Sequence, residues 1–189
     1  MSTTTSARQD RPAHELQIKE RTPQIIYTRD AQGNPVNAVI GFAHFLARLL
    51  ERTRPSHIAA LFDESLSSSF RNEIYPEYKA NREPAPPQLQ QQFQLCRQLC
   101  QALGIRDMAS TRYEADDLIG SLAQRFRSGA TQIVIVSRDK DLAQLIHERD
   151  IWWSFASGQQ FNYRALVKRF GVKPEQIADQ LAIAGDKVD

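Results

Sequence analysis

The chain has 189 residues, of which 41% are hydrophobic and 24% charged, and its formal net charge is +2. This balance is typical of a globular protein and argues against an intrinsically disordered one. The mean hydropathy is -0.48, and no apolar run approaches the ~20 residues that cross a bilayer, so a membrane-spanning protein is excluded. The length predicts one domain. The polar first ten residues do not read as a secretory signal, and we expect a cytoplasmic protein.

The first half of the chain changes from a polar extension to periodic segments. Residues 1–27 show little apolar periodicity and are expected to form a flexible extension, although residues 24–27 could be a short strand. Gly33 and Pro35 predict a turn over residues 30–35. Apolar residues at three- and four-residue steps then predict a helix over residues 36–54. The continuous apolar run at 57–62 predicts a strand buried on both faces, with Asp63 at its carboxyl end.

The second half alternates helices and strands. A polar stretch over residues 64–87 precedes a helix over 88–103, on which Cys96 and Cys100 are expected to be reduced, partly buried thiols. Another helix is predicted between Thr111 and Gly129, and a short one ends at Ile146. Strands are predicted at 132–136 and 151–155, and helices at 163–170 and 174–184. This alternation predicts an α/β fold with a mostly parallel sheet, whose ligands bind beyond the carboxyl ends of the strands.

Acidic residues occur where strands or helices give way to loops on that edge of the sheet. They are Asp63, Glu114, Asp116, Asp117, Asp139, Asp141, Asp186 and Asp189. Singly, each has a structural explanation: Thr111 and Glu114 fit a capping box, and the aspartates fit helix dipoles, an N-cap or a turn. Together they need counter-charge, because two carboxylates ~4 Å apart repel by roughly 4 kcal/mol. Oxygen ligands favour Mg²⁺ or Mn²⁺, which indicates metal-dependent phosphate chemistry.

Cations and aromatic residues are interleaved over residues 70–82. Arg71, Lys79 and Arg82 could neutralise phosphates, while Tyr75 or Tyr78 stacks on an unpaired base. Lys79 could also stabilise charge that develops on a transferred phosphate. The alternative is a solvated loop whose tyrosines pack against the protein. The four histidines are scattered, and the sequence contains neither a nucleophile elbow nor a Gly-rich phosphate loop.

In chain order, these motifs resemble the 5′-3′ exonuclease/flap endonuclease family, in particular small bacterial exonucleases and the N-terminal nuclease domain of bacterial DNA polymerase I. The matching stretches are residues 33–42, 60–63, 70–82, 113–117, 136–142 and 185–189. The resemblance implies a three-layer, PIN-like core over residues 28–189, with a mostly parallel central sheet and a helical arch. It also implies hydrolysis of DNA, and sometimes of RNA, from 5′ ends or at branched 5′ flaps.

The resemblance also implies a division of roles among the residues. One metal ion would be held by Asp63, Glu114 and Asp116. The second would be held by Asp116 or Asp117 together with Asp139, Asp141 and Asp186, with Asp189 nearby. Two Mg²⁺ ions, replaceable by Mn²⁺, are the expected cofactors. Lys79 and Arg82 would contact the scissile phosphate as catalytic residues, and we expect a monomer.

The sequence departs from the family pattern near both ends. Family members begin with an apolar strand that ends in Asp-Gly-Ser, and no such sequence precedes Asp30; Asp10 lies in a polar context. At the other end, the family continues into a helix–hairpin–helix module beyond the position of Asp189. We therefore expect an incomplete domain. Two alternatives follow: a catalytically impaired module that binds branched DNA without cutting it, and an unrelated Mg²⁺ phosphohydrolase of small substrates.

Overall fold

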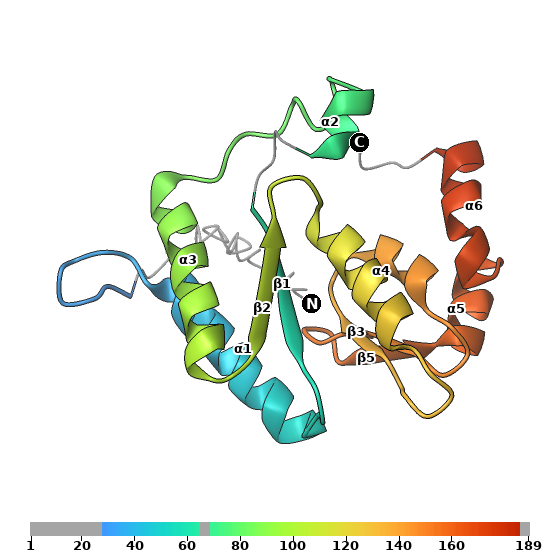
Figure 1. The fold of residues 1–189 in the computed structure, drawn as a ribbon, viewed down its shortest axis with the longest axis horizontal. Helices are drawn as coiled ribbons and strands as arrows, with labels where there is room; N and C mark the ends of the chain where they lie inside the picture. Colours follow the sequence, from blue (N-terminus) through green and yellow to red (C-terminus); the bar gives the residue numbers. More distant parts are fainter. Residues whose placement is uncertain (1–27, 65–68, 186–189) are drawn as a thin grey trace, which may run out of the picture.

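Figure 1 shows the computed structural model, which describes residues 28–64 and 69–185 as helices packed around short strands. The strands are β1 (Ala59–Asp63), β2 (Arg106–Ser110), β3 (Val134–Val136), β4 (Ile151–Ser154) and β5 (Gln159–Asn162). The helices are α1 (Asn37–Thr53), α2 (Phe70–Ile74), α3 (Pro87–Ala102), α4 (Ala115–Phe126), α5 (Tyr163–Phe170) and α6 (Ile177–Ala184), with short 3-10 helices η1 (Lys140–Leu145) and η2 (Pro174–Gln176). The predicted α/β class is confirmed. Within these ranges no helix is long and apolar enough to cross a membrane.

The strands form two sheets in the described part of the chain. β1 and β2 pair in parallel with Asp63 opposite Ser110, and β3 and β4 also pair in parallel. β5 pairs with β4 in the antiparallel direction and completes a hairpin. The mostly parallel pairing is as predicted, whereas the single expected sheet is present as a two-stranded and a three-stranded part.

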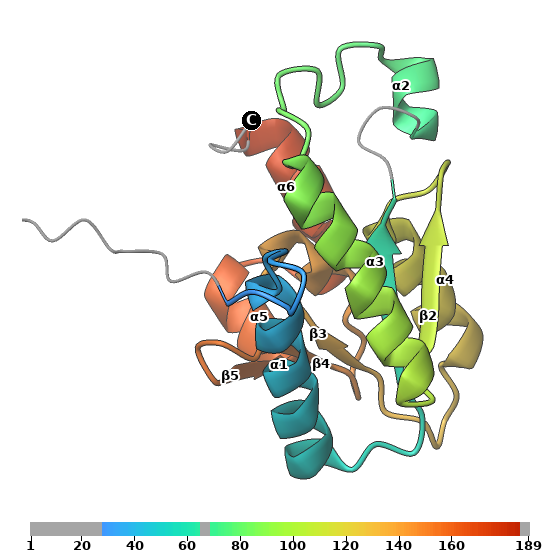
Figure 2. The same cartoon turned by 90° about the vertical axis from the view of Figure 1, so that its left-hand side faces the viewer.

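Helices cover both faces of β1 and β2. α1 and α3 lie side by side on one face, and α4 lies on the other (Figure 1 and Figure 2). Leu46, Cys100 and Ile105 are buried between α1, α3 and the strands. Cys96 and Cys100 are free and buried, and burial raises the pKa of both thiols. The prediction that both cysteines pack on one face of this helix is confirmed.

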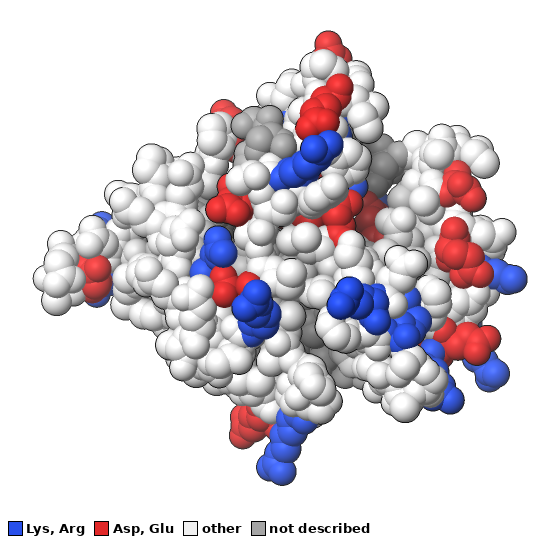
Figure 3. Space-filling view, in the orientation of Figure 1, with Lys and Arg blue, Asp and Glu red and all other residues white. Residues whose placement is uncertain are grey.

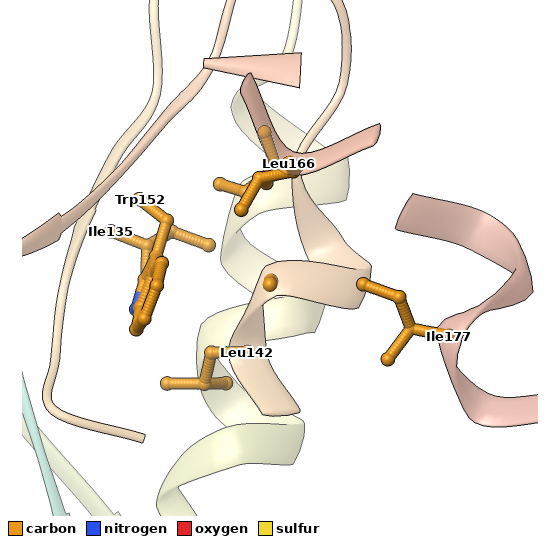
Figure 4. Close-up of a cluster of buried hydrophobic side chains, with 7 residues drawn as sticks. Ile135, Leu142, Trp152, Leu166 and Ile177 are labelled. Carbon is orange, nitrogen blue, oxygen red and sulfur yellow. The ribbon is translucent and has the colours of Figure 1, made fainter. Parts of the chain in front are cut away.

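A second core joins the three-stranded sheet to the C-terminal helices. Figure 4 shows its buried side chains turned toward one another from β3, η1, β4, α5 and α6. Among them, Leu166 is 0% exposed and Ile177 is 1% exposed. Burying such aliphatic side chains stabilises the fold by about 1.5–3 kcal/mol each. This core fixes the end of β3, from which the chain turns into η1 and its acidic residues.

A buried carboxylate ties α4 to the three-stranded sheet at the end away from the acidic residues. Asp150 is 1% exposed, and its Oδ2 accepts hydrogen bonds from Arg127 Nη2 at 2.6 Å and from the His147 backbone N–H at 3.0 Å. Arg127 Nε also donates to Oδ2 at 3.0 Å, and Arg127 Nη2 donates to the Leu145 carbonyl at 2.9 Å. The Ile133 backbone N–H donates to Oδ1 at 3.3 Å, so the buried charge is compensated by donors from three segments.

Removing Arg127 should strongly destabilise the protein. We expect Arg127→Ala to lower the free energy of unfolding by ~3–5 kcal/mol, because Asp150 would stay buried without its counter-charge. Denaturant unfolding measures the change. Arg125→Ala, an exposed position on the same helix, is the matched control and should change stability by less than ~0.5 kcal/mol. Equal stability of the two variants would show that Asp150 does not depend on Arg127.

Two strands, β2 and β5, were not predicted from the sequence, and a third, β1, is less buried than predicted. β2 contains Arg106 and Asp107 and lacks an apolar run; it forms because it pairs with β1 along its whole length. β5 is a polar edge strand, held where Phe161 stacks on Trp152 at 5.4 Å between ring centroids. β1 was expected to be buried on both faces, but its central residues are only half-buried. The expected extension 1–27, including the candidate strand 24–27, lies outside the described residues.

Candidate active site

Three of the acidic side chains, Glu114, Asp116 and Asp117, lie at the start of α4. Glu114 is the N-cap, and its backbone N–H donates to Asp117 Oδ2 at 3.0 Å. The capping box therefore joins Glu114 and Asp117, and the box expected between Thr111 and Glu114 is wrong. The difference arises because Ser110 Oγ accepts the N–H groups of Arg112 and Tyr113, which delays the start of the helix.

Four carboxylates converge at the ends of β1 and β3 and at the start of α4. Asp63, the last residue of β1, accepts the Ala115 N–H at 2.7 Å through Oδ1. Asp139 is the N-cap of η1, three residues after the end of β3, and accepts the Asp141 N–H at 2.9 Å. Asp116 lies among them: its burial, followed by repulsion from Asp139, Asp63 and Glu114, raises its pKa to about 6. Negative charge is concentrated here beyond what the fold neutralises.

The arch segment, residues 70–82, carries positive charge onto this cluster. Lys79 Nζ donates to Glu114 Oε2 at 2.8 Å, and the Tyr78 hydroxyl donates to the same oxygen at 3.3 Å. Burial alone would lower the pKa of Lys79, but its contacts with Glu114 and Tyr78 raise it above the ordinary value. Lys79 has a φ of 56°, a left-handed conformation that is uncommon outside glycine and that often marks a functional position. Figure 3 shows acidic surface directly beneath this raised segment.

Arg71 anchors the other end of the arch segment. Its two terminal nitrogens donate to the two oxygens of Asp117 at 2.7 and 2.8 Å, a bidentate pair. The hydrogen bond from Arg71 lowers the pKa of Asp117 below its usual range. From the sequence, Arg71 was predicted to bind DNA and Asp117 to bind a metal ion. In the structure these two residues bind each other.

A hollow of about 390 Å³ lies along the arch segment. It is lined by six arch residues and by Pro84 just beyond them: Asn72, Pro76, Tyr78, Lys79, Ala80, Arg82 and Pro84. Asn72 Nδ2 donates to the Tyr78 carbonyl at 2.9 Å and so supports the bend that brings Lys79 over the cluster. This role of Asn72 was not predicted, because an isolated asparagine carries no periodic or spacing signal in the sequence. Tyr75 is 56% exposed and its hydroxyl donates to Glu77 at 2.9 Å.

The donor set fits divalent metal ions by its chemistry. Asp63, Glu114, Asp116 and Asp139 present only carboxylate oxygens, which suit Mg²⁺ and Mn²⁺ better than Zn²⁺. Within residues 28–64 and 69–185, no three His, Cys, Asp or Glu side chains are already arranged to hold one ion in common. Asp186 and Asp189, two further predicted ligands, lie outside the described residues. Glu114 is paired with Lys79, and the adjacent Asp117 is paired with Arg71.

Residues 19–171 match the sequence model of the family described as "5'-3' exonuclease, N-terminal resolvase-like domain". The chain belongs to this 5′-3′ exonuclease family. The match begins before the expected domain start at residue 28, and that boundary stays a prediction. The family assignment from the ordered motifs is confirmed.

Individual relatives agree with the family match. A 5′-3′ exonuclease of Aquifex aeolicus is 36% identical over 159 residues, which cover 84% of this chain and 55% of the relative. A DNA polymerase I of Streptococcus pneumoniae is 38% identical over 165 residues, covering 85% of this chain and 19% of the polymerase. The chain thus spans about half the length of the first relative and about a fifth of the second.

Solved structures confirm the fold class. A T5 protein co-crystallised with metal ions has a TM-score of 0.68 at 21% identity, covering 78% of this chain and 58% of that one. A bacteriophage T5 flap endonuclease, solved as a pseudo-enzyme-product complex with DNA and metal ions, has a TM-score of 0.59 at 22% identity, covering 78% and 58%. At these identities the likeness establishes the shared PIN-like fold and leaves residue roles to be argued from this chain.

Proposed function

We propose that this member of the 5′-3′ exonuclease family hydrolyses phosphodiester bonds of DNA at 5′ ends or at 5′ flaps, in a reaction that needs divalent metal ions. The observation that carries the proposal is the convergence of Asp63, Glu114 and Asp139 around Asp116, beneath a lysine of the arch segment. Because these carboxylates repel one another, a bound cation would lower the free energy of their charged forms. The family and the neighbouring structures support the same reading.

We assign the acids to two groups of ligands, as the resemblance to the family implies. Asp63, Glu114 and Asp116 would hold one ion, and Asp116, Asp139 and Asp141 a second. Asp186 and the nearby Asp189 stay predicted for the second ion and lie outside the described residues. Two Mg²⁺ ions, or Mn²⁺ in their place, would activate a water molecule and stabilise the leaving oxygen. We leave Asp117 out of both groups, because both of its oxygens are engaged by Arg71.

The arch segment would hold the substrate. Lys79 lies on Glu114 and can exchange this partner for a phosphate oxygen without leaving the cluster, since both partners are anions. Arg82 and the hollow beside it would follow the DNA backbone, and the exposed ring of Tyr75 would stack on an unpaired base. Tyr78 is a weaker candidate for stacking because its hydroxyl is bound to Glu114.

The proposed function implies a nucleic-acid partner, and the free thiols indicate the compartment. DNA with free or branched 5′ ends is the proposed partner, and RNA is the competing substrate to be tested in parallel. The two free thiols fit a reducing compartment, in which we place the chain as a cytoplasmic monomer.

Replacing Asp139 should abolish cleavage. The assay incubates the chain with 5′-labelled flap duplex, in Mg²⁺, in Mn²⁺ and with a chelator, beside Asp139→Ala. We expect metal-dependent products from the parent and none from Asp139→Ala, because a predicted ligand of the second ion is missing. Glu51→Ala removes an exposed acid from α1 and should cut at the parental rate.

The other outcomes discriminate among functions. Binding of the flap duplex without products from the parent chain would overturn the nuclease proposal in favour of an impaired DNA-binding module. Cleavage of small phosphate esters but not of the duplex would indicate a different phosphohydrolase. A matched RNA flap decides whether the substrate class extends beyond DNA.

A further inference from the structure

We propose that Arg71 and Asp117 act as a positioning pair that holds the arch segment on the first turn of α4, and that neither residue contacts DNA or metal. This inference rests on the proposed nuclease function, because it assigns how that site is kept in register. It reassigns two charged residues that the sequence places on the substrate and on the metal.

The geometry of the pair leaves little of either group for a ligand. The guanidinium and the carboxylate meet through two hydrogen bonds of 2.7 and 2.8 Å. The guanidinium carbon also lies 4.7 Å from the centre of the Phe70 ring and 5.9 Å from that of Tyr78. Arginine is suited to this arrangement because its planar fork is matched to a carboxylate and stacks on aromatic rings.

Asp117 connects the arch segment to the first turn of α4, which carries the proposed metal ligands Glu114 and Asp116. Its Oδ2 accepts from Arg71 and also accepts the Glu114 backbone N–H at 3.0 Å. The Asp117 carboxylate therefore contacts the arch segment, through Arg71, and also the backbone of Glu114. A shift of Asp117 would move Glu114, and with it the adjacent Asp116.

Arg71 also sets where Lys79 can reach. The arch segment touches α4 at two points: Arg71 on Asp117, and Lys79 with Tyr78 on Glu114. The first contact is reinforced where the Phe70 backbone N–H donates to the Arg112 carbonyl at 2.9 Å. Lys79 must exchange Glu114 for phosphate during the reaction, so the Arg71 contact is the one that can persist and keep the segment in place.

A nearby ion pair offers a matched control. Arg112 and Glu73 connect the same two parts of the chain, with a nitrogen-to-oxygen distance of 3.2 Å, but their side chains are 59% and 61% exposed. An exposed pair of this kind contributes little. Arg112→Ala therefore removes an arginine from the same region without disturbing the turn.

The test is a double-mutant cycle of Arg71→Ala and Asp117→Ala, with Arg112→Ala as control. We expect each cycle variant to lower the single-turnover cleavage rate about 10- to 100-fold, because displacement of a catalytic group by ~1 Å has an effect of this size. The double variant should be no slower than the slower single variant. Arg112→Ala should cut within a factor of ~2 of the parent.

Three further readouts separate positioning from direct contact and from general loss of structure. The slope of DNA affinity against salt should be unchanged in Arg71→Ala, whereas loss of a phosphate contact would reduce it by about one. The charge-swapped variant, Arg71→Asp with Asp117→Arg, should recover part of the rate. In a Lys79→Ala background, Arg71→Ala should slow cleavage much less than in the parent.

The experiments distinguish failure of the positioning pair from failure of the proposed nuclease function. If the parent cuts DNA but the two single variants add independently, or if the salt slope falls, the positioning pair is wrong and the nuclease function stands. If the parent does not cut DNA, the proposed nuclease function is wrong. The positioning role of Arg71 and Asp117 is then tested by calorimetric titration with Mn²⁺. Weaker Mn²⁺ binding in Arg71→Ala than in Arg112→Ala would support the pair, because misplaced ligands would then outweigh the added negative charge. Equal or tighter binding in Arg71→Ala would overturn it.

Discussion

Asp116→Asn should make the protein more stable and at the same time nearly inactive. Asp116 is surrounded by Asp139, Asp63 and Glu114, and burial and their repulsion raise its pKa to about 6. Near neutral pH its charge therefore opposes folding, and the neutral amide removes this penalty with almost no change of shape. Cleavage should fall by roughly 1,000-fold or more, because the shared ligand of the two proposed ions is lost.

The sign of the stability change depends on pH. A folded pKa above the unfolded value means that Asp116 destabilises the fold increasingly as pH rises from about 4 toward 6. In chelator near neutral pH, Asp116→Asn should be more stable than the parent by ~1–2 kcal/mol, allowing for partial solvent exposure. Below pH ~4, where the carboxyl is protonated in both states, the difference should vanish.

The measurement is denaturant unfolding of both proteins across this pH range, in chelator. Asp107→Asn is the matched control with the opposite sign, because hydrogen bonds from Arg97 and Gln101 lower the pKa of Asp107. That variant should be less stable than the parent near neutral pH and should cut normally. A destabilised Asp116→Asn would show that the carboxylates do not crowd one another in solution.

Lys79→Ala should slow cleavage without weakening metal binding. In the structure Lys79 neutralises Glu114, and in the proposed reaction it moves to the phosphate, where charge develops. Loss of such a group lowers turnover by about 100- to 1,000-fold. Mn²⁺ affinity should be unchanged or tighter, because removing a cation leaves the acidic cluster more negative.

Single-turnover kinetics at saturating DNA and calorimetric Mn²⁺ titration measure the two effects separately. Lys168→Ala, which removes an exposed lysine from α5, controls for the change in net charge and should retain the parental rate. A Lys79→Ala variant that cuts as fast as the parent would exclude the proposed role. A parallel loss of Mn²⁺ affinity would instead indicate that Lys79 maintains the structure of the site.

The acidic cluster could be anticipated because it follows from a property of parallel sheets. Asp63 directly follows one apolar run and Asp139 lies three residues after another, and the carboxyl ends of parallel strands lie at one edge. Cys100 could be placed in the core for a similar reason, since its helix repeats apolar residues at regular steps. Both inferences need only a local pattern and a general rule of topology.

Contacts between distant polar residues could not be anticipated in this way. Nothing in the separate motifs of Arg71 and Asp117 indicates that they bind each other, because they lie 46 positions apart and each also fits a role with a ligand. β2 likewise has no apolar signature and exists because β1 pairs with it.

The sequence alone therefore determined the family, the fold class and the side of the sheet on which the carboxylates gather. Periodicity and motif order carry that information, because each segment contributes to it independently of the others. The tertiary structure decided which charges neutralise which: Lys79 on Glu114, Arg71 on Asp117 and Arg127 on Asp150. An ion pair forms only where the path of the whole chain brings two groups within hydrogen-bonding distance, and no local pattern encodes that path.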